Sequence, residues 1–300
     1  MKQEPAPSRQ ASDPIADRSL ERFFGQHPRN WRENRYVYPV VSRRSGGLSV
    51  GVNLNPDKTC NFNCIYCQVD RTVAPRVRTV DPDRLAAELD AMIRWVQEGT
   101  LFSQPPFEGV PAELRPMRDI AFSGDGEPTA CPQFPEAVKI AAALRSRYKL
   151  TDVKLRVITN ATLLTRPAVR AALAVLDDNN GEIWAKLDAG TEDYFQRICR
   201  PHVPLEHVLA NILDAARVRP LVIQSLWMNV DGQPPPDAEI DAYADRLGDI
   251  LAQGGRLKLV QIYTTARTPA EAYVTPLTAE QLEAIAARVR AHVEVPVRVY

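Results

Sequence analysis

The sequence predicts an α/β protein whose parallel sheet is curved into an incomplete barrel. Six short apolar runs each precede a stretch with helical periodicity, and the 300-residue chain is 45% hydrophobic and 25% charged. Strictly alternating strands and helices imply parallel strands joined by right-handed crossovers, and the composition is typical of a globular domain with a real core. Six units are two short of a closed eight-fold barrel. A doubly wound open sheet would give a similar pattern.

The first unit combines a buried strand with an amphipathic helix. LSVGVNL at 48–54 is typical of a buried strand, and a helix is predicted from Asp81. Asp81 can cap that helix and Pro82 suits its first turn. Its apolar stripe consists of Leu85, Leu89, Met92, Ile93 and Val96. These residues recur at helical spacing and predict a helix with one buried face.

The same alternation repeats five times along the rest of the chain. The predicted strands are 118–124, 154–160, 182–188, 221–230 and 257–264. The predicted helices are 133–147, 166–177, 204–217, 237–253 and 278–292. Thr278 and Gln281 form a capping-box pattern at the start of the last helix, and VPVRVY at 295–300 is a candidate final strand.

We divide the chain into an N-terminal extension at 1–47 and one domain at 48–300. Residues 1–17 are rich in Pro, Ser and Ala without periodicity, which predicts a disordered tail. Residues 18–47 mix arginines with aromatic side chains. Such a mixture can bind phosphates and stack bases, or it can pack its aromatics on the domain and leave its arginines in water. We favour packing.

A break in the alternation falls at 99–117, where four prolines separate the first helix from the second strand. Loops of this length in compact domains are usually functional or disordered. A lid and a surface insertion are both consistent with the sequence. We expect the substrate to lie beneath this loop.

The overall charge favours no polyanionic partner. Lys plus Arg equals Asp plus Glu at 37 each, so no global field recruits nucleic acid or an anionic membrane. RNA binding is therefore open but not favoured. The start of the chain lacks the apolar segment of a secretory signal, and no apolar run could span a bilayer. We expect a cytoplasmic protein, where cysteines more often bind metal or react than form disulfides.

Three of the five cysteines lie within eight positions, in TCNFNCIYCQVD at 59–70. Cys60, Cys64 and Cys67 directly follow the first predicted strand. A structural zinc site nearly always needs a fourth protein ligand, whereas Cys131 and Cys199 lie far away in sequence. Both are more simply interpreted as small buried thiols. Three thiolates on one loop suit a cubane iron–sulfur cluster with one iron left open.

With Tyr66 as the aromatic position, the motif C-x3-C-x-Φ-C resembles the signature of the radical S-adenosylmethionine (SAM) superfamily. The resemblance implies a partial (β/α)6 barrel with a [4Fe–4S] cluster and SAM as cofactors. It also implies reductive cleavage of SAM to a 5′-deoxyadenosyl radical that abstracts a hydrogen from the substrate. A flavodoxin or ferredoxin would donate the electron. The cofactors carry this chemistry and the protein orients them.

The resemblance also implies a set of SAM contacts. The Asp125-Gly126-Glu127-Pro128 stretch is similar to the family's G-G-E-P, with Asp125 in place of the first glycine. This assigns Gly126 and Glu127 to SAM, and Tyr66 of the cysteine motif is also assigned to cofactor binding. Asn160 and Asp188 end the third and fourth predicted strands, where functional residues of parallel barrels gather. The resemblance assigns Asp188 to the hydroxyls of the SAM ribose and Asn160 to orienting SAM. The family pattern on strand five is absent, which leaves the adenine contacts unassigned. The sequence singles out no catalytic residue.

Within the superfamily, the segments FSGDGEPT, KLDAGTEDYFQRICRP and IYTTARTPAEAYVTPLT resemble the branch that contains wyosine-type tRNA-modifying enzymes. Those enzymes condense pyruvate with a methylated guanosine and hold a second cluster with cysteines ahead of the motif. This sequence has no cysteine before Cys60. We therefore expect one cluster and a different, unidentified substrate.

Two other functions compete with a radical SAM enzyme. An iron–sulfur electron carrier without SAM chemistry ordinarily uses four cysteines per cluster and has no use for the Glu127 turn. A zinc-stabilised RNA-binding module is favoured only by the cysteines and the arginine-rich arm. Release of 5′-deoxyadenosine from added SAM would distinguish a radical SAM enzyme from both alternatives.

Overall fold

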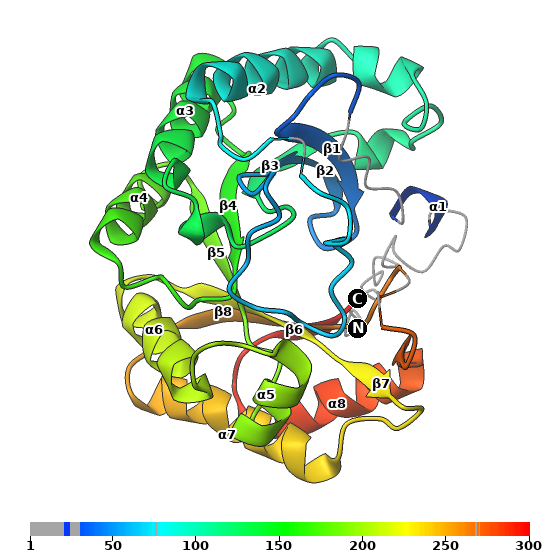
Figure 1. The fold of residues 1–300 in the computed structure, drawn as a ribbon, viewed down its shortest axis with the longest axis vertical. Helices are drawn as coiled ribbons and strands as arrows, with labels where there is room; N and C mark the ends of the chain where they lie inside the picture. The colour runs from blue at the N-terminus through cyan, green and yellow to red at the C-terminus, as the bar shows by residue number, and fades with distance from the viewer. Residues whose placement is uncertain (1–20, 25–30, 76, 268, 270) are drawn as a thin grey trace, which may run out of the picture.

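A computed structural model describes residues 21–24, 31–75, 77–267, 269 and 271–300. The predicted tail at 1–17 lies outside the described residues. A curved eight-stranded sheet forms the centre of the protein (Figure 1). In spatial order its strands are β1 (Val37–Ser42), β2 (Gly47–Val52), β3 (Met117–Phe122), β4 (Lys154–Thr159), β5 (Gly181–Lys186), β6 (Leu221–Leu226), β8 (Leu257–Tyr263) and β10 (Val297–Val299).

The strand order decides between the two predicted topologies. From β2 to β10 the strands are parallel and follow chain order, and β1 pairs antiparallel with β2. A doubly wound sheet instead reverses its order at a switch point. Among the described residues, no ladder joins the two edge strands β1 and β10. The sheet is therefore a barrel that stays open on one side, as the sequence predicted.

Helices cover the outer face of this sheet (Figure 1). They are α2 (Pro82–Gln97), α3 (Phe134–Arg147), α4 (Pro167–Asp177), α6 (Leu205–Val218), α7 (Asp237–Ala252) and α8 (Ala279–His292). The predicted caps are confirmed, because the Asp81 carboxylate accepts from the backbone N–H groups of Asp83 and Arg84, and Thr278 forms a capping box with Gln281. No helix in the described part of the chain has the length and apolar character needed to span a membrane.

The sheet begins earlier in the chain than the 47/48 boundary suggests. Strand β1 lies within the predicted extension and pairs with β2 from Val37↔Val52 to Ser42↔Gly47. Its proline, Pro39, hid the strand pattern, yet proline is tolerated on an edge strand. The aromatics Trp31, Tyr36 and Tyr38 are buried, as expected for an arm that packs on the domain, and a short helix, α1 (Glu21–Phe24), lies near the open side (Figure 1).

Two further elements differ from the prediction. The segment 221–230 is divided, because β6 ends at Leu226 and β7 (Met228–Val230) pairs with β9 (Val274–Pro276) in a separate antiparallel ribbon. The helix α5 (Glu192–Cys199) follows β5 and was not predicted. Its eight residues are too few for a clear periodic signal, although Thr191 caps it.

The 99–117 loop contains two 3₁₀ turns, η3 (Thr100–Ser103) and η4 (Ala112–Leu114), and it buries Phe102 and Phe107. The loop leads into β3, so it lies at the amino ends of the parallel strands. None of its residues lines the central cavity. The expectation that it covers the substrate is therefore wrong. A connection from a helix into a strand reaches the end of the barrel opposite the cysteine loop.

Candidate cluster and substrate site

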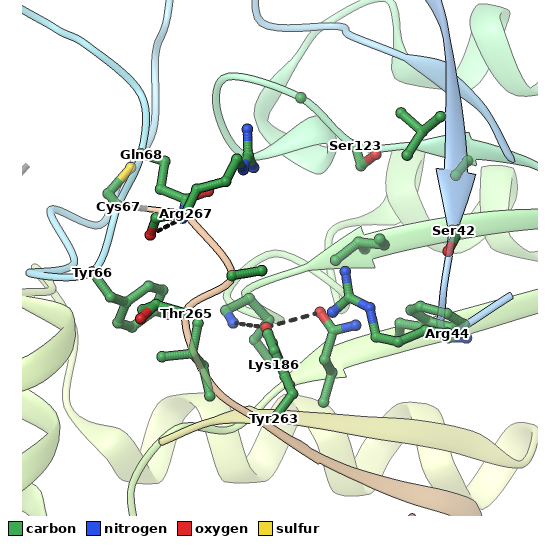
Figure 2. Close-up of a pocket in the computed structure, with 18 of the residues that line it drawn as sticks. Ser42, Arg44, Tyr66, Cys67, Gln68, Ser123, Lys186, Tyr263, Thr265 and Arg267 are labelled. Carbon is green, nitrogen blue, oxygen red and sulfur yellow. Dashed lines mark hydrogen bonds between the residues drawn. The ribbon is translucent and has the colours of Figure 1, made fainter. Parts of the chain in front are cut away.

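A cavity of about 1140 Å³ occupies the inside of the open barrel. Its lining includes the three motif cysteines together with Tyr66, Gly126, Glu127 and Asn160. Figure 2 shows Tyr66 and Cys67 at one end, Arg44 at the opposite end, and Lys186 and Tyr263 between them. Single ligand pockets usually hold about 300–1,000 Å³. The cavity therefore has room for more than one small molecule.

The cysteine loop is fixed to the end of β4 by side-chain amides. Asn61 Nδ2 donates to Thr162 Oγ1 at 2.7 Å, and Asn160 Nδ2 donates to Asn61 Oδ1 at 2.7 Å. The predicted residue Asn160 thus contacts the cysteine loop directly. Because Asn160 also accepts from the Thr162 hydroxyl at 2.7 Å, the three polar side chains form a closed network.

Two other elements hold the same loop through the backbone. The N–H groups of Asn63 and Ile65 donate to the carbonyls of Cys199 and Ile198 at 3.1 and 2.9 Å, at the carboxyl end of α5. On the opposite side, a Cβ atom on Gly126 would lie 1.9 Å from the Thr59 carbonyl oxygen. Only glycine permits this close approach of two backbones.

Each motif sulfur has a hydrogen-bond donor nearby. The Phe62 N–H lies 3.5 Å from Cys60 Sγ, and Arg71 Nη1 lies 3.7 Å from Cys67 Sγ. A hydrogen bond from Cys199 lowers the pKa of the Cys64 thiol, whereas burial raises the pKa of Cys60 to about 11. Donors to sulfur stabilise thiolates and tune the clusters that they bind. Within the described residues, no group of three His, Cys, Asp or Glu side chains is arranged so that it could hold a single metal ion.

Cys199 has a different setting from the one that the sequence suggested. It is buried, as expected, but it lies against Cys64 instead of remote from the motif. No spacing rule could place it there, because α5 brings it to the loop from a distant part of the chain. Cys131 is also buried and does not line the cavity.

Glu127 joins the ends of two strands. Its Oε1 accepts from the Thr129 N–H at 3.0 Å and from the Thr159 hydroxyl at 2.7 Å, and its Oε2 accepts from the Asn160 N–H at 2.7 Å. Burial raises the pKa of this carboxyl and outweighs these hydrogen bonds, which lower it. Asp125, in place of the family's first glycine, accepts from Asn53 at 2.7 Å. Both carboxylates therefore fix the turn after β3.

Asp188 lies behind Tyr66, outside the cavity lining. Its Oδ2 accepts from the Tyr66 hydroxyl at 2.5 Å, and its Oδ1 accepts from the Leu226 N–H at 2.8 Å. Lys186 Nζ lies 3.2 Å from the same carboxylate and donates to the Tyr263 hydroxyl at 3.0 Å. Burial would lower the pKa of Lys186, but Asp188 and Tyr263 more than offset it and raise that pKa. Asp188 thus positions two side chains that face the cavity.

The sequence pattern of the radical SAM superfamily matches residues 54–247, about two thirds of the chain. The chain belongs to the radical SAM superfamily. Its cofactors are accordingly a [4Fe–4S] cluster and SAM. Membership favours SAM-dependent radical chemistry over a simple electron carrier or a zinc-stabilised RNA-binding module.

Two curated relatives illustrate the reach of the similarity. The chain is 33% identical over 179 residues to the UPF0026 protein slr1464 of Synechocystis, which covers 59% of this chain and 57% of that protein. It is 25% identical over 256 residues to a protein named GTPase Obg from Brachyspira hyodysenteriae, which covers 84% of this chain and 33% of that protein. The radical SAM chain thus spans less than two thirds of the length of these relatives.

Among solved structures, the chain is similar to Streptococcus suis SuiB bound to SAM, with a TM-score of 0.54 and 10% identity. That match covers 86% of this chain and 49% of SuiB and shows a shared fold. A structure of TYW1 with a lysine–pyruvate adduct matches with a TM-score of 0.48 and 17% identity, over 82% of this chain and 74% of that one.

The residues present fit the cofactors of a radical SAM protein. Three free cysteines lie on one loop beside the cavity. At the same end, the Thr265 hydroxyl is buried without a hydrogen-bond partner among the described residues, and Figure 2 shows it beside Tyr66. A buried polar atom of this kind requires a partner, and SAM offers polar groups. Sequence reasoning missed Thr265 and Lys186, although a lysine that ends a buried strand was a usable signal.

Proposed function

We propose that Cys60, Cys64 and Cys67 hold the cluster and that the protein generates a 5′-deoxyadenosyl radical inside the barrel. The cofactors supply the chemistry, in which one electron cleaves the C5′–S bond of SAM and the resulting radical removes a hydrogen atom from the substrate. The observation that carries this proposal is the cysteine loop, which three separate elements hold at one end of a large cavity.

In this proposal the turn after β3 receives SAM through its backbone. Gly126 faces the cavity, while Glu127 and Asn160 hold the turn and the cysteine loop in place. Thr265 offers SAM a hydroxyl, and Tyr66 offers a ring face. Asp188 acts indirectly, because its oxygens already hold Tyr66 and Lys186. This assignment replaces a direct contact between Asp188 and the ribose.

A small electron-transfer protein, a flavodoxin or ferredoxin, is the proposed donor. It must approach the cysteine loop from outside the barrel, where Asn63 and Asp70 are exposed and the three cysteines are only partly buried. The proposal does not require RNA, and the arginine-rich arm buries its described aromatics Trp31, Tyr36 and Tyr38 in the domain.

The decisive experiment is anaerobic reconstitution with iron and sulfide, followed by chemical reduction and chromatography of added SAM. The protein should bind about four irons per chain and release 5′-deoxyadenosine and methionine. Cys131→Ala, which changes a buried thiol outside the cavity, serves as the matched control and should behave like the wild type. A protein that holds the cluster yet never cleaves SAM would contradict the proposal.

A second incubation tests the substrate expectation. With methylguanosine-containing tRNA, pyruvate, SAM and reductant, we expect no tricyclic base. Formation of that base, or about eight irons per chain in place of about four, would overturn the expectation of one cluster and a different substrate.

A further inference from the structure

Arg44 enters the barrel from the hairpin between β1 and β2. Its Cζ lies 4.7 Å from the centre of the Tyr263 ring and 5.7 Å from that of Trp184. Its Nη1 atom is buried and has no hydrogen-bond partner in the described part of the chain. Leaving a charged donor desolvated and unpaired is costly. The position therefore calls for a negatively charged partner.

The carboxylates near Arg44 are already engaged by other cations. Asp119 pairs with Arg156, whose Nε also lies 3.0 Å from Glu182. Lys258 and Lys154 hold the other oxygen of Glu182 at 2.5 and 3.4 Å. We call these residues together with Arg44 the floor. Arg44, Asp119 and Arg156 line the cavity, whereas Glu182, Lys154 and Lys258 lie outside its lining and connect to Arg156 through ion pairs. Cations outnumber carboxylates in the floor, so the negative charge must come from outside it.

The side chains around Arg44 suit a small oxyanion. The rings of Trp184 and Tyr263 flank the Arg44 guanidinium, and all three side chains line the cavity. Such stacking holds a guanidinium flat, and its fork matches a carboxylate or phosphate group in two parallel hydrogen bonds. Trp184 is itself fixed, because its Nε1 donates to Glu182 Oε1 at 2.9 Å.

The floor and the cysteine loop lie at opposite ends of one cavity, with Lys186 and Tyr263 between them (Figure 2). We infer that Arg44 holds the oxyanion group of a small organic substrate in the floor, so that the rest of the substrate extends toward the cysteine end. The inference that the substrate presents its reacting carbon at the cysteine end rests on the proposed function, whereas the inference that Arg44 binds an anion does not.

Calorimetric titration of the full-length reconstituted protein at constant ionic strength tests this inference. The probes are benzoate and inorganic phosphate, which distinguish a carboxylate site from a phosphate site. We expect the wild type to bind one of them and Arg44→Gln to bind it about tenfold more weakly or worse, because a charge-assisted hydrogen-bond pair is lost. Arg44→Lys keeps the charge without the fork and should lie between the two.

Arg35→Gln is the matched control, since Arg35 is an exposed arginine just before β1 that does not line the cavity. It should bind the probe as the wild type does. Equal affinity of the wild type and Arg44→Gln, or no binding of either probe by the wild type, would overturn the inference. Thermal unfolding of each variant checks that it is folded.

The same samples separate this inference from the proposed function. If the wild type binds the probe through Arg44 but releases no 5′-deoxyadenosine from SAM, the proposed function fails and the anion site stands. If SAM is cleaved but probe binding is independent of Arg44, the anion site alone is wrong.

Discussion

The two ends of the cavity are built in opposite ways. At the cysteine loop, amides and backbone groups of three elements satisfy one another. At the floor, ion pairs are crowded together and one guanidinium nitrogen has no partner among the described residues. Preorganisation positions a cofactor precisely, whereas uncompensated charge selects a ligand. The comparison indicates that the first end is built for geometry and the second for recognition.

The largest effect should follow from removing a motif thiol. Cys60→Ala, Cys64→Ala and Cys67→Ala should each abolish iron binding and SAM cleavage, because two thiolates hold a cubane poorly. Iron content and visible absorption of the reconstituted variants provide the measurement. Cys131→Ala should keep its iron. Cys199→Ala should also keep its iron, because in the proposal the three motif thiolates hold the cluster and Cys199 only contacts Cys64. Loss of iron from Cys199→Ala would identify a fourth ligand and break the comparison.

Glu182 tests the floor through pH. Burial raises its pKa, but Arg156, Lys258 and Trp184 outweigh burial and lower that pKa to about 2 from 4.5. A carboxyl whose pKa is lower in the folded state than in the unfolded state stabilises the fold at pH values above its unfolded-state pKa. This stability is lost as the pH falls toward the folded-state pKa. Glu182 should therefore contribute about 3 kcal/mol that disappears between about pH 5 and about pH 2.

Urea unfolding across this range measures the effect. The difference in unfolding free energy between the wild type and Glu182→Gln should shrink as pH falls. Glu283→Gln, which removes a surface glutamate, controls for the loss of one charge. A difference that stays constant with pH would mean that the floor does not depend on ion pairs.

Gly126→Ala tests the close contact between the β3 turn and the cysteine loop. The added methyl group would overlap the Thr59 carbonyl oxygen, and such overpacking costs about 1–3 kcal/mol. We expect a lower unfolding temperature and weaker cluster retention. Gly248→Ala, with nothing within 4 Å of its new methyl group in α7, should be neutral or more stable by up to about 1 kcal/mol. If both variants have the same unfolding temperature and cluster retention, the turn after β3 does not hold the cysteine loop.

Asn61→Ala should have the smallest effect. It removes two hydrogen bonds and leaves the Asn160 amide without its partner, at a cost of about 1–2 kcal/mol. We expect faster release of iron to a chelator, with the cluster still able to form. Asn179→Ala removes a single local hydrogen bond to Val175 far from the motif and should leave the release rate unchanged. Equal rates in the two variants would show that the loop needs no amide support.

The sequence alone determined the features that depend on local spacing. The thiols of Cys60, Cys64 and Cys67 follow one another on a single loop, so the joint role that we propose for them could be inferred without a structure. Asn160 and Glu127 could also be predicted at the cavity, because parallel strands place their carboxyl ends at one edge. The six strand–helix units were recovered for the same reason, since helical and strand periodicities are local properties.

The tertiary structure decided what depends on distant segments meeting. The open barrel brings Arg44 against Trp184 and Tyr263, and α5 brings Cys199 against Cys64. It also sends the 99–117 loop to the wrong end for a lid and places Asp188 behind Tyr66. No local pattern encodes these contacts, because each depends on how the sheet curves and where it stays open. The sequence therefore specified the cysteine loop, and the fold specified the cavity that its cysteines line.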